Sequence, residues 1–205
     1  MTATVPAGIL AVIRATSPEL ALTAARGLAA AGVDGIEITF TVPVAGEVIR
    51  ELSGRVAPPV GAGTVRSLDE CRAAAAAGAR FVVSPDLDAG VVALAHELGL
   101  AAAPGALTPS EVGRCLAAGA DAVKVFPIGV MGGAGYLRTL DEPFPGTAWV
   151  VSGGVLAEQV RDYVAAGART VCMGGALLDR AALQAGDVDG VALYASGVLA
   201  AARAG

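Results

Sequence analysis

The sequence predicts an α/β protein whose residues 1–205 form one compact domain, a (β/α)8 TIM barrel. Short apolar runs alternate with longer segments that carry helical spacing and capping residues. Eight such runs are present, and a repeated Ala-Ala-Gly motif closes four of the intervening helices. Strands and helices that alternate through short turns require a parallel sheet, and eight units of about 25 residues suit a closed barrel. An open, doubly wound sheet is the alternative architecture.

The expected strands follow one another at regular intervals. They are residues 10–13, 35–40, 60–65, 81–84, 100–103, 122–126, 149–152 and 170–173. Helix signals fill the intervals. Ser-Pro at residues 17–18 is an N-cap followed by proline, and residues 67–70 and 108–111 match the Ser/Thr-x-x-Glu capping box. Glycines stand where C-terminal caps are expected, at Gly32, Gly78, Gly119 and Gly167.

The composition excludes several classes of protein. Charged residues make up 16% of the chain and hydrophobic residues 55%, so the chain has ample surface to bury and is not disordered. Some of this surface is expected to be buried against other subunits. A net charge of -5, without any block of like charges, argues against nucleic acid as a partner. The apolar run at residues 8–13 is too short for a membrane span or a signal core, so we expect a cytoplasmic protein without membrane association.

Cysteine and histidine are too few for the common metal or disulfide frameworks. Cys71, Cys115 and Cys172 are widely spaced and odd in number, which is typical of reduced thiols that serve as small apolar residues. The single histidine, His96, cannot supply a histidine-rich metal site, and we expect it to be partly exposed near a helix end. No metal site is therefore expected.

Lysine usage is the most informative feature of the composition. All of the 14 Lys and Arg residues except Lys124 are arginine, and Lys124 lies inside the apolar run at residues 122–126. Burial can lower the pKa of a lysine amine until it is a neutral nucleophile that forms a Schiff base with a carbonyl, which arginine cannot do. A snorkelling or salt-bridged lysine is the structural alternative.

The Ala-Ala-Gly repeat relates Lys124 to a carboxylate. The repeat precedes the second, fourth, sixth and eighth expected strands, and the residues five positions beyond its glycines are Glu37, Val83, Lys124 and Cys172. In a (β/α)8 barrel, four side chains from alternate strands form one interior layer. Glu37 and Lys124 are therefore expected to face each other across the barrel axis, as an acid/base and a nucleophile. A buried ion pair without a function is the alternative.

The residues that follow the strands are expected at the C-terminal mouth of the barrel, where such folds carry their chemistry. Glycine turns at residues 152–154 and 173–175 offer backbone amides that suit a phosphate. Arg14 and Thr64 are expected there as donors to a carboxylate. Such a mouth is suited to a 2-keto acid with a distal anion. The glycine cluster at residues 131–135 is expected to form a mobile loop rather than a binding site.

Several segments together resemble one known family. They are IEITFTVP at 36–43, GAGTV at 61–65, VSP at 83–85, PG at 104–105, TPSE at 108–111, VKVFP at 123–127 and SGG at 152–154. In this order they resemble the 2-keto-3-deoxy-6-phosphogluconate (KDPG) aldolase family of class I aldolases, which includes 4-hydroxy-2-oxoglutarate (KHG) and phosphogalactonate relatives. The resemblance runs from about Ile9 to Leu178.

The resemblance implies a homotrimer of barrels, without metal or cofactor, that cleaves a small 2-keto acid. Lys124 is implied as the Schiff-base lysine and Glu37 as the proton carrier. The resemblance implies that Arg14 and Thr64 contact the substrate carboxylate. It implies phosphate contacts at Ser152, Gly153, Gly154, Gly174 and Gly175. Phe126 and Pro85 are implied to shape the pocket. The implied reaction converts 2-dehydro-3-deoxy-6-phosphogluconate to pyruvate and glyceraldehyde 3-phosphate, or 4-hydroxy-2-oxoglutarate to pyruvate and glyoxylate.

The sequence also departs from the family pattern. Thr41 stands where some members have arginine, residues 128–129 lack a carboxylate found in relatives, Ser152 replaces a common threonine, and Ala176 stands where a serine is usual. A phosphogalactonate or an unphosphorylated 2-keto acid is therefore an alternative substrate. Two other functions stay open: a metal-free sugar-phosphate isomerase or epimerase with Glu37 as base, and a sugar-acid-binding barrel without catalysis. Residue Asp86, near the mouth, has no assigned role.

Overall fold

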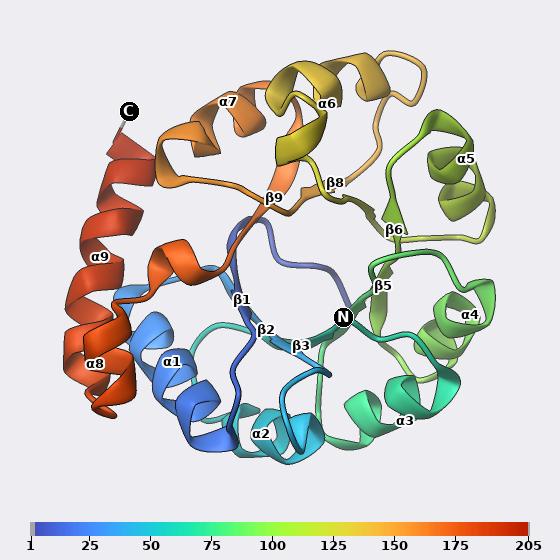
Figure 1. The fold of residues 1–205 in the computed structure, drawn as a ribbon. Coiled ribbons are helices and arrows are strands. Elements are labelled where there is room, and N and C mark those ends of the chain that lie inside the picture. Colours follow the sequence, from blue (N-terminus) through green and yellow to red (C-terminus); the bar gives the residue numbers. More distant parts are fainter. Residues whose placement is uncertain (1–2, 205) are drawn as a thin grey trace.

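Nine parallel strands form the inner ring of the protein and helices form the outer ring (Figure 1). The structure, a computed structural model, describes residues 3–204. The strands are β1 (Gly8–Ile13), β2 (Gly35–Thr39), β3 (Val60–Gly63), β4 (Phe81–Val83), β5 (Ala101–Ala103), β6 (Gly105–Ala106), β7 (Val123–Val125), β8 (Trp149–Val151) and β9 (Ala168–Met173). Their order in the sheet is β5-β4-β3-β2-β1-β9-β8-β7-β6.

The helices alternate with the strands. They are α1 (Pro18–Ala31), α2 (Ala45–Leu52), α3 (Leu68–Ala76), α4 (Ala89–Glu97), α5 (Pro109–Ala117), α6 (Ala134–Asp141), α7 (Val160–Ala165), α8 (Arg180–Gln184) and α9 (Val188–Ala204). Three 3-10 turns add to them, η1 (Gly129–Met131), η2 (Ala157–Gln159) and η3 (Gly175–Leu177). The final helix, α9, packs along α1. The predicted barrel is thus confirmed, and the open sheet is excluded.

The fifth strand of the barrel is interrupted, which the sequence analysis did not predict. β5 pairs with β4 and β6 pairs with β7, and only Pro104 separates β5 from β6. Proline has no N–H to give to a neighbouring strand, but its carbonyl still accepts the Lys124 N–H at 2.9 Å. The expected strand at residues 100–103 is therefore shorter than the real one, which continues beyond Pro104 and closes the ring.

The ends of the chain close the ring on the other side. β9 pairs with β1 in parallel, with Leu10 opposite Cys172. The Thr170 hydroxyl donates to the Pro6 carbonyl at 2.6 Å. All other pairings in the sheet join strands that are neighbours along the chain. The β1–β9 ladder is therefore the one contact in the described sheet that joins the two ends of the sequence.

Two apolar cores hold the architecture. The larger lies between the sheet and the helices. The smaller fills the barrel and contains Val5, Leu10, Phe81, Val83, Ala101, Ala103, Ala122, Val150 and Cys172. Val83 and Cys172 thus lie inside the barrel, as the repeat register predicts for two of its four positions.

The helix-capping predictions are mostly confirmed. The Ser17 side chain accepts the Leu20 N–H at the start of α1, and Thr108 and Glu111 form a reciprocal capping box on α5. On α3 only half of the box forms, because Ser67 accepts the Glu70 N–H while the Glu70 carboxylate accepts the Arg66 N–H at 2.6 Å. The glycine cluster at residues 131–135 ends η1 and begins α6, so it is more ordered in secondary structure than the expected loop.

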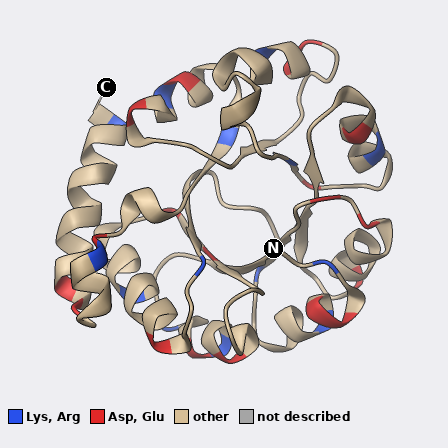
Figure 2. Cartoon of the chain, viewed as in Figure 1, with Lys and Arg blue, Asp and Glu red and all other residues tan. Residues whose placement is uncertain are grey.

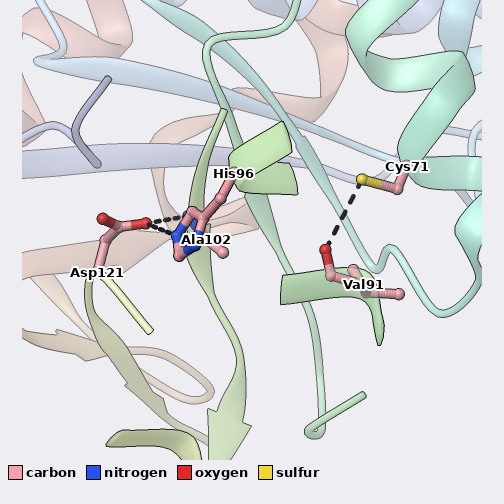
Figure 3. Close-up of polar contacts among 5 residues, drawn as sticks. All are labelled: Cys71, Val91, His96, Ala102 and Asp121. Carbon is pink, nitrogen blue, oxygen red and sulfur yellow. Dashed lines mark hydrogen bonds and ion pairs between the residues drawn. The ribbon is translucent and has the colours of Figure 1, made fainter. Parts of the chain in front are cut away.

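Most charged residues belong to the outer helices (Figure 2). His96 is in the last turn of α4, and its Nε2 lies 2.8 Å from the Asp121 carboxylate, which also accepts the Ala102 N–H (Figure 3). This agrees with the expected position of the histidine near a helix end. Cys71, Cys115 and Cys172 are buried free thiols, as expected. Among the described residues, no helix is both long and apolar enough to span a membrane.

The close approach at the interrupted strand predicts a strong effect of Gly105→Ala. A Cβ at Gly105 would lie 2.1 Å from the Pro85 carbonyl oxygen, which is backbone. We expect the free energy of unfolding to fall by about 2 kcal/mol or more. Gly46→Ala in α2 is the matched control, because its Cβ would meet nothing nearer than 4.0 Å; it should gain up to about 1 kcal/mol. Urea unfolding followed by circular dichroism measures both, and equal stabilities would contradict the prediction.

Candidate active site

A cavity of about 450 Å3 lies at the carboxyl ends of the strands. It is lined by Val12, Arg14, Glu37, Thr64, Pro85, Lys124, Phe126, Ser152, Gly153, Gly154, Val155, Leu156, Cys172, Gly174, Gly175 and Ala176. All of the residues that the sequence analysis assigned to a site are in this set. The cavity therefore brings together side chains from both halves of the chain at one end of the barrel.

Lys124 and Glu37 reach the cavity from the barrel interior. Lys124 lies on β7, is 6% exposed, and has its Nζ 5.1 Å from the centroid of the Phe126 ring. Glu37 lies on β2 and is fully buried. Within residues 3–204, neither carboxylate oxygen of Glu37 has a hydrogen-bond partner. The two groups thus share a cavity without forming the hydrogen-bonded ion pair that was the structural alternative.

The glycines of β3 create the space for this arrangement. A Cβ on Gly63 would lie 1.8 Å from the Glu37 Oε1 atom, and one on Gly61 would lie 2.3 Å from the Phe81 ring. Side chains at these positions would therefore expel either the carboxyl group or the aromatic ring of the barrel core. The Gly-Ala-Gly motif serves here to make room for neighbouring side chains, and neither glycine lines the cavity itself.

Burial determines the protonation of Glu37. Desolvation in the barrel raises the pKa of the Glu37 carboxyl above its ordinary value, and the positive charges of Lys124 and Arg14 oppose this rise. A carboxyl with a raised pKa keeps its proton to a higher pH than an exposed glutamate does. The cavity therefore contains a nearly buried amine and a buried carboxyl group.

Threonine hydroxyls hold Arg14 at the mouth. Arg14 donates from Nη1 to the Thr41 Oγ1 at 2.7 Å and from Nη2 to the Thr64 Oγ1 at 3.2 Å. The Thr41 hydroxyl lies 2.8 Å from that of Thr39, which donates to the Ile13 carbonyl. Sequence reasoning noted Thr41 only as a departure and missed Thr39. The guanidinium is thus oriented by residues that follow β2 and β3.

Thr64 has an unusual backbone. Its φ of 57° lies in the left-handed region, which a β-branched residue rarely adopts. Such strain at a cavity wall is typical of a functional position that the surrounding fold enforces.

The other end of the cavity is built from backbone. Gly153 and Gly154 form a turn after β8 with φ values of 92° and 78°. Among the described residues, the N–H groups of Gly154, Val155, Gly175 and Ala176 donate no hydrogen bond within the protein. Free amides that converge in this way suit an anion. The charged side chains that line the described cavity are Arg14, Glu37 and Lys124, and none of them comes from these turns.

Cys172 also lines the cavity, and its thiol is strongly desolvated. Burial, assisted by the Glu37 carboxylate, raises the pKa of its thiol to about 12. The site assignments omitted this residue, although the repeat register had placed it at the height of Lys124. Val12, Val155 and Leu156 were also missed, because apolar wall residues carry no chemical signature. In the part of the chain that the structure describes, no cluster of three or more His, Cys, Asp or Glu side chains could hold a metal ion.

Comparisons with known proteins agree on one family. A family model described as KDPG and KHG aldolase matches residues 3–193. The chain is 33% identical over 180 residues to the 2-dehydro-3-deoxy-phosphogluconate aldolase of Treponema pallidum. The aligned region covers 87% of this chain and 86% of that protein. It is also 33% identical over 184 residues to a probable 2-dehydro-3-deoxy-6-phosphogalactonate aldolase of Rhizobium meliloti, with 88% of this chain and 85% of that protein covered.

A solved structure adds a close fold match. It is the KDPG aldolase of Legionella pneumophila with pyruvate captured at low pH as a covalent carbinolamine intermediate. The TM-score is 0.84 at 25% identity, and 94% of each chain is covered.

The raised pKa of Glu37 predicts a pH-dependent stability difference between the wild type and Glu37→Gln. The native pKa exceeds the unfolded value of about 4.3, so the unfolded chain releases its proton first as the pH rises. The contribution of Glu37 to stability is therefore complete below about pH 4 and is lost as the pH rises through its native pKa. The glutamine of Glu37→Gln does not titrate, so this variant should gain stability relative to the wild type as the pH rises from about 4 through the native pKa of Glu37. Urea unfolding at several pH values measures the difference, and one that is constant or shrinks with pH would contradict the assignment.

Proposed function

The chain belongs to the KDPG and KHG aldolase family and is a carbon-carbon lyase of that kind, and on this premise we propose how it acts. It cleaves 2-dehydro-3-deoxy-6-phosphogluconate to pyruvate and glyceraldehyde 3-phosphate through a Schiff base on Lys124. Cleavage of 4-hydroxy-2-oxoglutarate to pyruvate and glyoxylate is a second activity of the same site.

One observation carries the proposal. The only lysine of the chain lies nearly buried in the cavity that also contains a buried Glu37 carboxyl, with no hydrogen bond to Glu37 in residues 3–204. Burying two ionisable groups is costly unless they pair or carry out chemistry. A carboxyl that does not pair with the amine is free to exchange protons with a substrate.

The reaction begins with attack of the neutral Lys124 amine on the C2 carbonyl carbon. Glu37 gives a proton to the carbinolamine hydroxyl, which leaves as water, and the product is a protonated imine that withdraws electrons from the neighbouring C3–C4 bond. Glu37 takes the proton of the C4 hydroxyl, directly or through a water molecule, and the bond breaks to release an aldehyde and leave an enamine on Lys124.

The second half restores the enzyme. Glu37, now protonated, returns its proton to C3 of the enamine and forms the imine of pyruvate. Water hydrolyses this imine, the released proton returns to the Glu37 carboxylate, pyruvate leaves, and the free amine of Lys124 is regenerated. One carboxyl thus acts as base and then as acid, a role that suits a group with a raised pKa.

The two ends of the cavity orient the substrate. The carboxylate next to the keto group binds Arg14, which is already held by Thr41 and Thr64. The distal phosphate binds the amides of the turns at residues 153–154 and 174–175, together with the Ser152 hydroxyl. Phe126 and Pro85 form the wall between the two ends.

A second candidate substrate is another 2-keto-3-deoxy acid, either phosphogalactonate or an unphosphorylated compound. The observation that favours it is the absence of a charged side chain at the distal end, where Val155, Leu156 and Ala176 line the described cavity. Backbone amides alone bind a phosphate less strongly than amides combined with side-chain donors.

The protein is also proposed to be a cytoplasmic homotrimer. Large apolar side chains such as Leu193 and Val164 are 79% and 55% exposed, which supports burial against other copies. Three buried free thiols suit a reducing compartment. Sedimentation equilibrium measures the oligomeric state, and a monomer at micromolar concentration would contradict the trimer.

The mechanism predicts that pyruvate and borohydride trap one covalent adduct on Lys124. Borohydride reduces the imine to a stable amine, so the intact mass rises, and peptide mapping should place the change at residue 124. Lys124→Arg should form no adduct and should lose at least about a thousandfold in kcat/KM, because arginine cannot act as the nucleophile. Glu37→Gln is the companion variant and should still form the adduct while cleavage slows. A folded wild type without an adduct would favour the isomerase or the binding function instead.

The distal end predicts a gain from Ala176→Ser. A hydroxyl at this position would add a hydrogen bond to a phosphate, so KM for the phosphorylated substrate should fall about threefold to tenfold. The same variant assayed with the unphosphorylated analogue is the control, for which KM should not change. Equal effects on both substrates would indicate that the phosphate does not bind at this end.

A further inference from the structure

A second cavity of about 450 Å3 lies outside the barrel, where η1 and α6 meet η2 and α7. It is lined by Gly129, Gly132, Gly133, Ala134, Gly135, Arg138, Gln159, Asp162 and Tyr163. None of these residues lines the candidate active site. The second cavity is therefore a separate feature, and it does not depend on the function proposed above.

The cavity opens onto an uncapped helix start. The N-cap of α6 is Gly133, and no side chain caps this end. Among residues 3–204, the N–H groups of Ala134 and Gly135 donate no hydrogen bond within the protein. Helix α6 has eight residues, so its first turn presents free donors and the positive end of a helix dipole.

The side chain of Arg138 lies close to this positive helix end. The guanidinium of Arg138 extends back along its own helix, and its Nη2 is 3.9 Å from where a Cβ on Gly135 would be. Basic groups are favourable at the C-terminal end of a helix and unfavourable at its N-terminal end. No acidic group forms an ion pair with Arg138 in the described part of the chain. The Arg138 guanidinium therefore lies near the helix start without an ion-paired partner in the described residues, although Asp162 also lines the cavity.

A buried hydroxyl faces the same space. Tyr163 lies on α7, is 1% exposed, and its hydroxyl has no hydrogen-bond partner within the described residues. The hydroxyl oxygen is 3.3 Å from where a Cβ on Gly133 would be, so the glycine leaves room in front of it. A buried hydroxyl without a partner costs roughly 1–3 kcal/mol, and a ligand that accepts from it would remove this cost. This is the second, independent sign of an acceptor in the cavity.

Gln159 supplies further donors. Its Oε1 accepts the Leu156 N–H at 3.0 Å, which fixes the amide so that its NH2 group remains available. Asp162 is the one acidic residue in the lining and opposes an anion. The groups that can bind an anion are more numerous: they are the Arg138 guanidinium, two helix amides, the Tyr163 hydroxyl and the Gln159 amide. The donor set exceeds the acceptors, which is the composition of an oxyanion site.

We propose that this cavity, formed by the first turn of α6 with Arg138, Gln159 and Tyr163, binds a small phosphate-type oxyanion. Two hydrogen bonds join its walls to the turn after β8 that lines the candidate active site. They run from the Gly129 N–H to the Gly153 carbonyl and from the Leu156 N–H to Gln159. An anion in the second cavity would therefore stabilise the position of that turn.

The test is a titration of the 15N-labelled protein with inorganic phosphate, followed residue by residue through the amide resonances. The site predicts saturable shifts at Ala134 and Gly135, which separate this cavity from any phosphate at Gly154 and Gly175. Arg138→Gln should weaken the binding at least about tenfold, because it removes a charge-assisted contact. Tyr163→Phe should weaken it about threefold to tenfold and should leave folding intact, because the lost hydroxyl has no partner among the described residues.

Two control variants complete the experiment. Tyr136→Phe removes a hydroxyl that donates to the Leu107 carbonyl, outside the cavity, and should leave phosphate affinity unchanged. Asp162→Asn removes the opposing charge and should tighten phosphate binding. The proposal is overturned if Ala134 and Gly135 show no saturable shift, or if Arg138→Gln binds as the wild type does. Should Tyr163→Phe not fold, the opposite effects of Arg138→Gln and Asp162→Asn decide the outcome.

Discussion

The burial of the Glu37 carboxyl inside the barrel is the constraint on which the rest of this structure depends. A carboxyl group without a hydrogen-bond partner in residues 3–204 is tolerated only where the fold leaves no alternative. Glycine at position 63 makes the room, because any side chain there would collide with the carboxyl oxygen. The positive charges of Lys124 and Arg14 offset part of the free-energy cost of desolvating this carboxyl group.

The mouth of the barrel is organised by a different principle, the orientation of one flexible side chain. Arginine carries considerable rotamer freedom, and the hydrogen bonds that Arg14 donates to Thr41 and Thr64 restrict it before a ligand binds. The left-handed backbone of Thr64 is part of this arrangement, since it directs the hydroxyl toward the guanidinium. The positive charge is thus supplied from the end of β1 and held by residues that follow β2 and β3.

The sequence was sufficient for the fold and for the central pair of residues, because both leave local or periodic signals. The repeat register predicted that Glu37 and Lys124 share a layer, and the scarcity of lysine identified the amine. The interruption at Pro104 was not predictable, since it depends on which strand lies on each side of the proline. The same holds for Gly61 and Gly63, whose neighbours are distant in sequence, and for Tyr163, whose hydroxyl loses its partners only once α6 and α7 pack together.

The ladder between β1 and β9 has a consequence for synthesis on the ribosome. Every other strand can pair with a neighbour soon after it emerges, but one edge of β1 lacks its partner until residues 168–173 have been made. For most of translation the nascent sheet therefore presents an open, apolar edge, which is the kind of surface that recruits other chains. Ring closure waits for β9, which pairs with β1 and removes that edge, and α9 packs against α1 beside it. Growing chains of this protein are thus exposed to mispairing until almost their last residues, and the ring protects only the finished molecule.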